Sequence, residues 1–265
     1  MGIPLRGGLV ALPDARRTEY WEFPPPPALA HAVALGWEGR PGWARMLRVL
    51  PDGCADLVWD GRRLLVSGAH TGPVRVAVDD GGTSVGVRLR PGIAGTLAGC
   101  PASRLDPRPV PLRLLRGPEV RPLEERLRAA DGPAAARGVL EHAVGRLLEA
   151  GPQPDRAVLE AARRLTVGPA GVERVAAAVG LTPRELRRRF HEQVGYGPKT
   201  LERVLRFRRF VRRLEAVASG RTSLAGIAAA LGYADQAHLG RECLRLSGSP
   251  PGALLSRWAA SAETF

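Results

Sequence analysis

Three kinds of residue have the types and spacing to do chemistry: a serine between glycines, a histidine beside a glutamate, and a large number of arginines. Gly82-Thr-Ser84-Val-Gly86 matches the G-x-S-x-G pattern of a serine nucleophile. That serine must sit where a strand turns into a helix, and here an alternating strand pattern follows, so we expect a turn. His191-Glu192 begins like the zinc motif H-E-x-x-H, but Gly195 stands in the place of the second histidine.

The cysteines give no metal site either. Cys54, Cys100 and Cys243 are far apart and odd in number, which favours free thiols over a disulfide framework or a zinc cluster. No phosphate-binding loop or dinucleotide motif is present in the sequence. We therefore expect no metal, no cofactor and no enzyme activity. An enzyme that uses the N-terminal half is kept as a minor alternative, and it would retain turnover without the C-terminal half.

The arginines point to a polyanionic partner. The chain has 39 basic and 26 acidic residues, a net charge of +13, and a pI near 11.2. The excess is concentrated at the C-terminal end, where residues 155–265 carry 19 basic and 10 acidic side chains, or +9. Lys199 is the single lysine, and this bias is typical of a GC-rich genome, so the choice of arginine over lysine is not in itself a sign of phosphate recognition.

The N-terminal half has the pattern of a small antiparallel sandwich or barrel. Short apolar runs alternate with turn residues, which predicts strands at 44–50, 55–59, 63–67, 74–78 and 84–89. The four prolines Pro24 to Pro27 should be extended. Trp37, Trp43, Trp59, His31, His70 and Cys54 could line a ligand cavity, but core and turn positions explain most of them better.

Helical spacing replaces this pattern after Pro118. Two helices carry Leu123, Leu127, Val139, Ala143, Leu147 and Leu148, and Gly132-Pro133 separates them. We expect an α+β chain of four parts: a β-rich regulatory or sensor domain at 1–117, a helical connector that could also pair with a second copy at 118–154, an all-α domain at 155–258, and a tail at 259–265.

The all-α part contains an internal repeat. Ala176-Ala-Ala-Val179-Gly180 and Ala228-Ala-Ala-Leu231-Gly232 nearly coincide, and each closes a helix with an apolar stripe. The stripes are Val172, Val175, Ala176 and Val179 in the first copy, and Leu224, Ile227, Ala228 and Leu231 in the second. Small alanines allow close helix contact, and a glycine can adopt the positive φ of a sharp turn. The repeat predicts two helix-turn-helix motifs.

A second helix follows each turn. Thr182-Pro183-Arg184-Glu185 is a capping box with proline at the first helical position, and Asp235 is the natural N-cap in the second copy. The expected buried residues are Leu186, Phe190 and Val194 in the first copy, and Leu239 and Cys243 in the second.

One long helix is expected between the copies, from Lys199 to Ala218, with an apolar face of Leu201, Val204, Leu205, Val211, Leu214 and Ala218. Twenty residues span about 30 Å, close to the roughly 34 Å between successive major grooves. This helix would hold two recognition helices one DNA turn apart.

These residues resemble a known family. Two helix-turn-helices joined by a long helix, with Gly195-Tyr-Gly-Pro-Lys199, Arg206-Phe-Arg-Arg209 and Gly232-Tyr233, are similar to the DNA-binding domain of AraC/XylS-type transcriptional regulators over roughly 156–257. Leu50-Pro-Asp-Gly-Cys54 and Val87-Arg-Leu-Arg-Pro-Gly92 resemble a sensor-like domain of uncharacterised role found in front of such domains. A DNA-repair relative can share the DNA-binding domain, but its clustered cysteines are absent from this sequence.

The resemblance implies which residues contact DNA. Base-reading positions carried over from the family are Arg184, Arg187 and Arg188 in the first copy, and Gln236, Ala237, His238, Gly240 and Arg241 in the second. Contacts to DNA phosphates are expected from Thr182, Lys199, Arg206 and Arg209. Arginine can bind guanine bidentately and glutamine can bind adenine, whereas Ala237 and Gly240 offer little beyond close approach. The first helix should therefore carry most of the discrimination, with a preference for G-containing half-sites.

Two departures weaken the second copy. Cys243 stands where the family usually has phenylalanine, and Leu254-Leu255 replaces an aromatic-arginine ending, which predicts looser packing. The expected function is a cytoplasmic, sequence-specific transcription regulator modulated by its N-terminal half; a non-specific or architectural DNA-binding protein is the main alternative. Double-stranded DNA is the expected partner. RNA polymerase, a small-molecule effector and a second copy of the chain stay open as further partners, and no membrane partner is expected.

Overall fold

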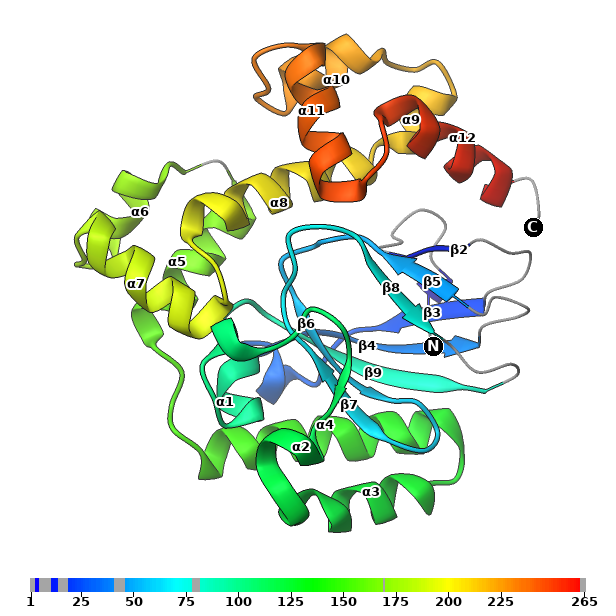
Figure 1. Ribbon diagram of the computed structural model, residues 1–265, viewed down its shortest axis with the longest axis vertical. Helices are drawn as coiled ribbons and strands as arrows, with labels where there is room; N and C mark the ends of the chain where they lie inside the picture. Colours follow the sequence, from blue (N-terminus) through cyan, green and yellow to red (C-terminus); the bar gives the residue numbers. More distant parts are fainter. Residues whose placement is uncertain are drawn as a thin grey trace.

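The computed structural model describes residues 3–4, 11–13, 19–40, 46–77, 82–168 and 170–262. In these ranges, the N-terminal half forms two antiparallel sheets (Figure 1). The larger has the order β1-β3-β4-β9-β6-β7-β10, with bounds Ile3–Pro4, Glu19–Phe23, Val33–Arg40, Ser84–Leu89, Ala55–Trp59, Leu64–Ser67 and Val110–Pro111. The smaller has the order β2-β5-β8, with bounds Ala11–Pro13, Met46–Val49 and Val74–Ala77.

The predicted strands at 55–59 and 84–89 are confirmed, and those at 44–50, 63–67 and 74–78 are confirmed over 46–49, 64–67 and 74–77. Ala44, Trp43 and Val78 lie outside the described residues. The strands β3 and β4 were not predicted, because glycines and charged residues interrupt their apolar alternation. The proline run is extended, as expected, until Pro27 opens a short 3-10 helix, η1 (Pro27–Leu29).

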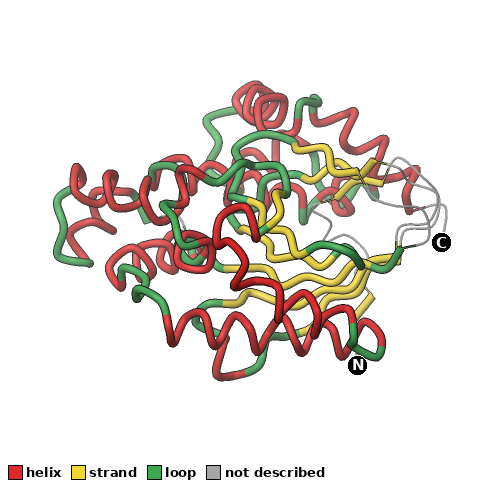
Figure 2. Tube along the Cα trace, turned by 60° about the horizontal axis from the view of Figure 1, so that its bottom comes forward, coloured by secondary structure: helices red, strands yellow, loops and turns green. Residues whose placement is uncertain are grey.

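The helices expected to connect the two halves pack on the larger sheet. They are α3 (Arg121–Arg128) and α4 (Gly132–Ala150). Leu140 and Val144 of α4 lie in one hydrophobic core with Leu57 and Val87 of the central strands. Shorter elements complete this half: α1 (Ala94–Ala98), η2 (Ala102–Arg104), α2 (Arg113–Arg116) and η3 (Gly117–Val120). The strands lie between α3 and α4 on one side and the C-terminal helices on the other (Figure 2).

The C-terminal half is helical throughout its described residues. Its elements are α5 (Arg156–Val167), α6 (Val172–Ala178), α7 (Pro183–Val194), α8 (Pro198–Val211), α9 (Leu214–Ala218), α10 (Leu224–Ala230), α11 (Gln236–Ser247) and α12 (Pro251–Ala262). They form two hydrophobic cores, one around α6 and α7 and one around α10 and α11. None of the described helices is both long and apolar enough to cross a membrane.

The helix between the copies is shorter than the sequence predicts. The expectation of one helix from Lys199 to Ala218 is wrong, since α8 ends at Val211 and spans about 21 Å at the standard rise. The amide of Arg213 bonds to the carbonyl of Phe210, three residues back, at 2.8 Å, and this tight turn places Leu214 in the second core. Ala218, expected on the apolar face, is exposed.

The helix α8 belongs to both cores. Leu201 and Leu205 pack in the first core, whereas Val204, Phe207 and Phe210 pack in the second. The two phenylalanines were not among the predicted core residues, because the pattern was interpreted as one apolar stripe. Since buried residues lie on two faces of α8, little of this helix is left for contact with another molecule.

Candidate DNA-binding surface

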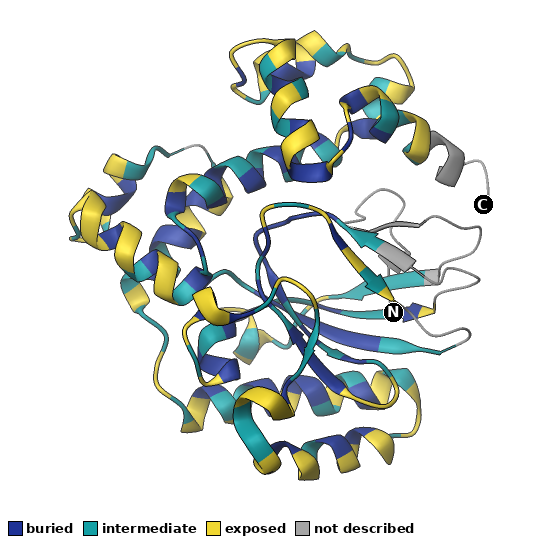
Figure 3. Cartoon of the chain, viewed as in Figure 1, coloured by how far each residue is buried: buried dark blue, intermediate teal, exposed yellow. Residues whose placement is uncertain are grey.

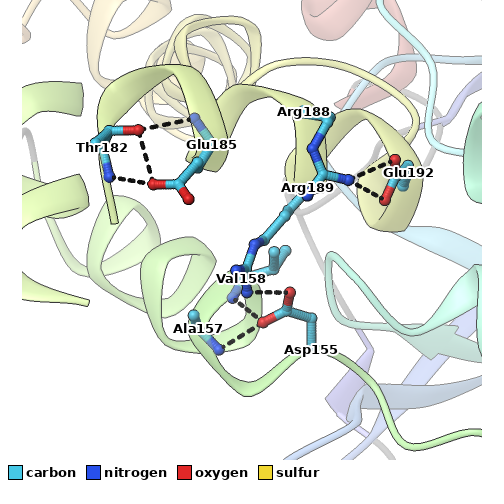
Figure 4. A network of polar contacts seen from close by, with 8 residues as sticks. All are labelled: Asp155, Ala157, Val158, Thr182, Glu185, Arg188, Arg189 and Glu192. Carbon is cyan, nitrogen blue, oxygen red and sulfur yellow. Dashed lines mark hydrogen bonds and ion pairs between the residues drawn. The ribbon is translucent and has the colours of Figure 1, made fainter. Parts of the chain in front are cut away.

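The first helix-turn-helix begins its second helix with the predicted cap. Gly180 has φ +70°, and the amide of Leu181 bonds to the carbonyl of Ala176 at 3.0 Å, which closes α6. The Thr182 hydroxyl accepts from the Glu185 amide at 3.2 Å, and the Glu185 carboxylate accepts from the Thr182 amide at 3.0 Å (Figure 4). The bond from the Thr182 amide lowers the pKa of Glu185. The capping box is therefore confirmed, and it fixes where α7 starts.

One face of α7 is buried and its other faces are exposed, as the sequence predicts. Leu186, Phe190 and Val194 are buried, and Arg184, Arg187 and Arg188 are exposed (Figure 3). Arg188 forms an ion pair with Glu192 at 3.0 Å. Within the described residues, Arg184 and Arg187 form no hydrogen bond or ion pair. Two of the three predicted base-reading arginines are thus unengaged at the exposed start of α7.

A fourth arginine of α7 has an internal role. Arg189 is half-buried and donates to Asp155 at 3.2 Å. The same carboxylate caps α5 by accepting from the amides of Ala157 and Val158, at 2.9 and 3.3 Å (Figure 4). Arg189 therefore ties the recognition helix to α5.

The second copy repeats this backbone with different side chains. Gly232 has φ +74°, and Asp235 caps α11 by accepting from the His238 amide, as predicted. Gln236, Ala237 and Arg241 are exposed, and neither Gln236 nor Arg241 has a polar partner among the described residues. A Cβ on Gly240 would meet nothing within 4 Å.

His238 is partly engaged within the turn. Its Nδ1 accepts from the Ala234 amide at 3.2 Å, and its ring meets the edge of Tyr233 at 5.3 Å between centroids. Of the predicted reading residues in this copy, His238 is the one that also stabilises the turn.

The residues predicted to contact phosphate all have partners inside the chain. Lys199 pairs with Glu202 at 2.8 Å, and Thr182 is taken up by the capping box. Arg206 donates to the Gly232 carbonyl at 3.1 Å and stacks over the Tyr233 ring, whereas Arg209 donates to the carbonyls of Leu165 and Thr166. Phosphate contact by these four residues stays a prediction.

One strong ion pair was missed by the sequence analysis. Arg203 of α8 binds Glu242 of α11 through both nitrogens of one edge, at 2.7 and 2.5 Å. The bond to Glu242 raises the pKa of Arg203, and the bond to Arg203 lowers the pKa of Glu242. The partners are 39 residues apart, so no local pattern could have revealed this pair. It fixes the second recognition helix to α8.

A second missed feature is a buried polar cluster in the N-terminal half, formed by Glu22, Asp52, Asp56 and Arg88. Arg88 Nε lies 3.2 Å from Asp56 and 3.5 Å from Asp52. Burial acts to raise the pKa of Asp52, but the charges of Arg88 and Arg208 outweigh it and hold this pKa below its usual value. The signal in the sequence was a lone arginine in the apolar strand Ser84–Leu89.

The described residues among those considered for a ligand cavity have core and turn positions, and two of them, Trp37 and Cys54, hydrogen-bond to the acids Asp56 and Asp52. Trp59, Cys54 and His70 are buried and His31 is exposed, whereas Trp43 lies outside the described residues. The Trp37 ring lies against Gly86, and its Nε1 donates to Asp56 at 3.0 Å. Burial, followed by the charge of Asp52, raises the pKa of Cys54 to about 12. The buried thiol is therefore not a nucleophile at neutral pH.

The G-x-S-x-G pattern at 82–86 and the partial H-E-x-x-H pattern at 191–195 lack the structural context that each motif requires. Ser84 opens β9, which continues as a strand to Leu89, so no helix follows the serine. His191 and Glu192 are exposed at the end of α7, and Gly195 is its C-cap with φ +97°.

Two family models match the chain. Residues 21–111 match a domain of unknown function, DUF6597, and residues 175–257 match a helix-turn-helix domain. The second match covers both helix-turn-helix copies and leaves α5 outside. No curated protein matches the chain.

Two solved structures of ToxT from Vibrio cholerae are similar to this chain. An apo variant from strain SCE256 is 12% identical, with a TM-score of 0.39, over 80% of this chain and 89% of that chain. ToxT from strain O395 is 8% identical, with a TM-score of 0.39, over 91% of this chain and 97% of that chain. The chain thus carries a helix-turn-helix domain at residues 175–257, preceded by a domain of unknown function at residues 21–111.

Proposed function

We propose that the protein is a sequence-specific transcription regulator that reads two adjacent major grooves with the first turns of α7 and α11. The observation that carries this proposal is the repeated arrangement of a capped, exposed helix start with unengaged polar side chains. Arg184 and Arg187 occupy this position in α7, and Gln236 and Arg241 occupy it in α11. Base edges in the major groove are read by side chains at such helix starts.

The two helices contribute unequally in this proposal. In this proposal Arg187 binds a guanine. Arg187→Ala should therefore reduce the preference for the best site over a site in which that guanine is replaced, by roughly 10- to 100-fold, or about 1–3 kcal/mol. Arg241→Ala should weaken binding to all sequences about equally. The measurement is competition binding at fixed salt concentration, with duplexes that contain this guanine and duplexes in which it is replaced. Arg108→Ala, which removes an equally charged exposed residue from the N-terminal half, is the control. Equal losses of specificity for Arg187→Ala and Arg241→Ala would contradict the asymmetry.

Selection of genomic fragments by the purified protein, with random duplex DNA as competitor at physiological salt, tests the proposed function itself. Recovery of a small set of sites sharing G-containing half-sites about one turn apart supports a regulator. Uniform recovery with a steep salt dependence would favour the architectural alternative, because phosphate contacts alone carry no sequence information.

The N-terminal half modulates DNA binding in this proposal. This half packs on the C-terminal helices, since Leu50, in the loop that follows β5, shares a core with Phe207 and Phe210. An effector bound there can regulate only if its affinity differs between the DNA-competent and DNA-incompetent states. Substitutions in β3 and β4 that destabilise the N-terminal half test this coupling. If the coupling exists, the Kd of the full chain for DNA should change relative to wild type.

A further inference from the structure

Both recognition helices end on the N-terminal half. The helix α7 ends at Gly195, where a Cβ would lie 3.3 Å from the Ala102 carbonyl oxygen, next to η2. The helix α11 ends at Gly248, which has φ +65°, and a Cβ there would lie 2.9 Å from the Arg48 guanidinium and 3.4 Å from Pro73. Arg48 also donates to the neighbouring Ser249 hydroxyl at 3.3 Å. Each helix is therefore held at its C-terminal end by a different part of the N-terminal half.

The opposite ends of the two helices are exposed and make no hydrogen bond or ion pair with the described residues of the N-terminal half. Thr182 and Asp235, the N-caps, are both exposed. The sheets lie on the other side of α8 from α10 and α11 (Figure 1). Because the N-terminal half contacts α7 and α11 at their C-terminal ends, it also determines how far apart their N-terminal ends lie.

Between the two contacts, the loop Leu50–Cys54 docks on α8. Gly53 has φ +87°, and a Cβ there would lie 2.8 Å from the Leu201 side chain and 3.9 Å from the Tyr196 hydroxyl. Leu50 is 2% exposed and packs in the second core. The loop thus touches both cores at the helix they share, and the close approach at Gly53 leaves no room for another side chain.

Opposite charges face each other across this contact. Burial acts to raise the pKa of Asp52, but the charge of Arg88, followed by that of Arg208 of α8, holds this pKa below its usual value. Burial raises the pKa of Glu22, and the charges of Arg88 and Arg208 offset this only in part. The pKa of Arg212 is lowered, first by its neighbour Arg208 and then by burial, and Glu22 and Asp52 partly offset this. Negative charge of the N-terminal half therefore lies close to the C-terminal end of α8, where Arg212 is the C-cap.

We propose that the N-terminal half sets the spacing between the two DNA half-sites, by holding α7 and α11 at their C-terminal ends and α8 between them. The inference rests on the proposed function, because it requires both helices to read DNA. Arg48 is a positioning residue in this arrangement, because it contacts Gly248 and Ser249 at the end of α11: it acts on spacing and not on base choice.

The test is selection from a random duplex library long enough to hold two half-sites, with the full-length chain. The wild type should recover one dominant half-site spacing. Arg48→Gln should recover the same half-site sequences over a spacing range wider by at least one base pair in each direction, and its affinity for the optimal pair should fall about 3- to 10-fold, since less of the geometry is preorganised. Arg75→Gln is the matched control, because Arg75 is exposed, lies opposite Arg48 on the neighbouring strand β8 and carries the same charge.

The outcomes separate the two proposals. Recovery of no motif by the wild type overturns the proposed function and the spacing inference with it. A motif containing a single half-site, or the same spacing distribution for wild type and Arg48→Gln, overturns the spacing inference alone, as does equal broadening by Arg75→Gln. If Arg48→Gln fails to fold, which thermal melting would show, Ser249→Ala tests the same inference, because it removes the hydroxyl that accepts from Arg48 at the α11 contact.

Discussion

In the first helix-turn-helix unit, Arg189 holds the recognition helix to α5, whereas in the second unit Glu242 holds it to Arg203 of α8. The turns themselves are alike, with Gly180 and Gly232 at φ +70° and +74°. What differs is the set of long-range contacts and the exposed side chains. A repeated motif therefore determines the path of the backbone, while the residues outside the repeat determine how rigidly each copy is held and what it can read.

The largest difference between the units should come from their buried anchors. Phe190 and Cys243 each lie four residues after a buried leucine, and both are fully buried. Phe190→Ala should cost about 3–5 kcal/mol of unfolding free energy because it leaves a large cavity, whereas Cys243→Ala should cost about 1–2 kcal/mol. Urea denaturation followed by circular dichroism measures both. Equal costs would mean that the cores are equally dependent on their anchors.

The two inter-helix ion pairs should differ by a smaller amount. Arg203–Glu242 is bidentate and less exposed than Arg189–Asp155. A double-mutant cycle with alanine should give a coupling of about 1–2 kcal/mol for the first pair, and below about 1 kcal/mol for the second, since exposed pairs are screened by solvent. A stronger coupling at Arg189–Asp155 would reverse the order of rigidity that we assign to the two units.

The caps should behave alike in both units. Thr182→Ala and Asp235→Ala each remove a side chain that accepts from an amide in the first turn, so each should cost about 1 kcal/mol. The glycine variants at the same positions should cost only a few tenths of a kcal/mol, because glycine is tolerated at an N-cap. Thermal melting of the four variants distinguishes the loss of a cap from the loss of a packed side chain.

The smallest effect is the dependence on pH that the Arg203–Glu242 pair gives to the second unit. The pKa of Glu242 is lowered, so its contribution to stability is present above the ordinary value of 4.5 and is lost as pH falls through the lower folded value. Glu242→Gln should flatten the acid limb of the stability curve relative to wild type. An unchanged acid limb would show that the Arg203–Glu242 pair does not stabilise the folded state.

The sequence predicted the local features of this fold well. The capping box at Thr182, the N-cap at Asp235 and the strand Ala55–Trp59 all depend on residues close together in the chain. It failed where the partner is remote. Arg206 and Arg209 have the pattern of solvated arginines on a helix, yet they bond to carbonyls 26 and 44 residues away. A helical period shows which face a side chain occupies, but not which element lies opposite it.

The membership of α8 in both cores has a consequence for how the C-terminal half unfolds. If the second unit opens, Val204, Phe207 and Phe210 lose their cover, and the helix that carries them also supplies Leu201 and Leu205 to the first unit. We therefore expect disorder in one copy to weaken the other, so that the pair opens as a single cooperative unit. In the proposed function, DNA bound at either α7 or α11 should then slow hydrogen exchange in the opposite unit as well.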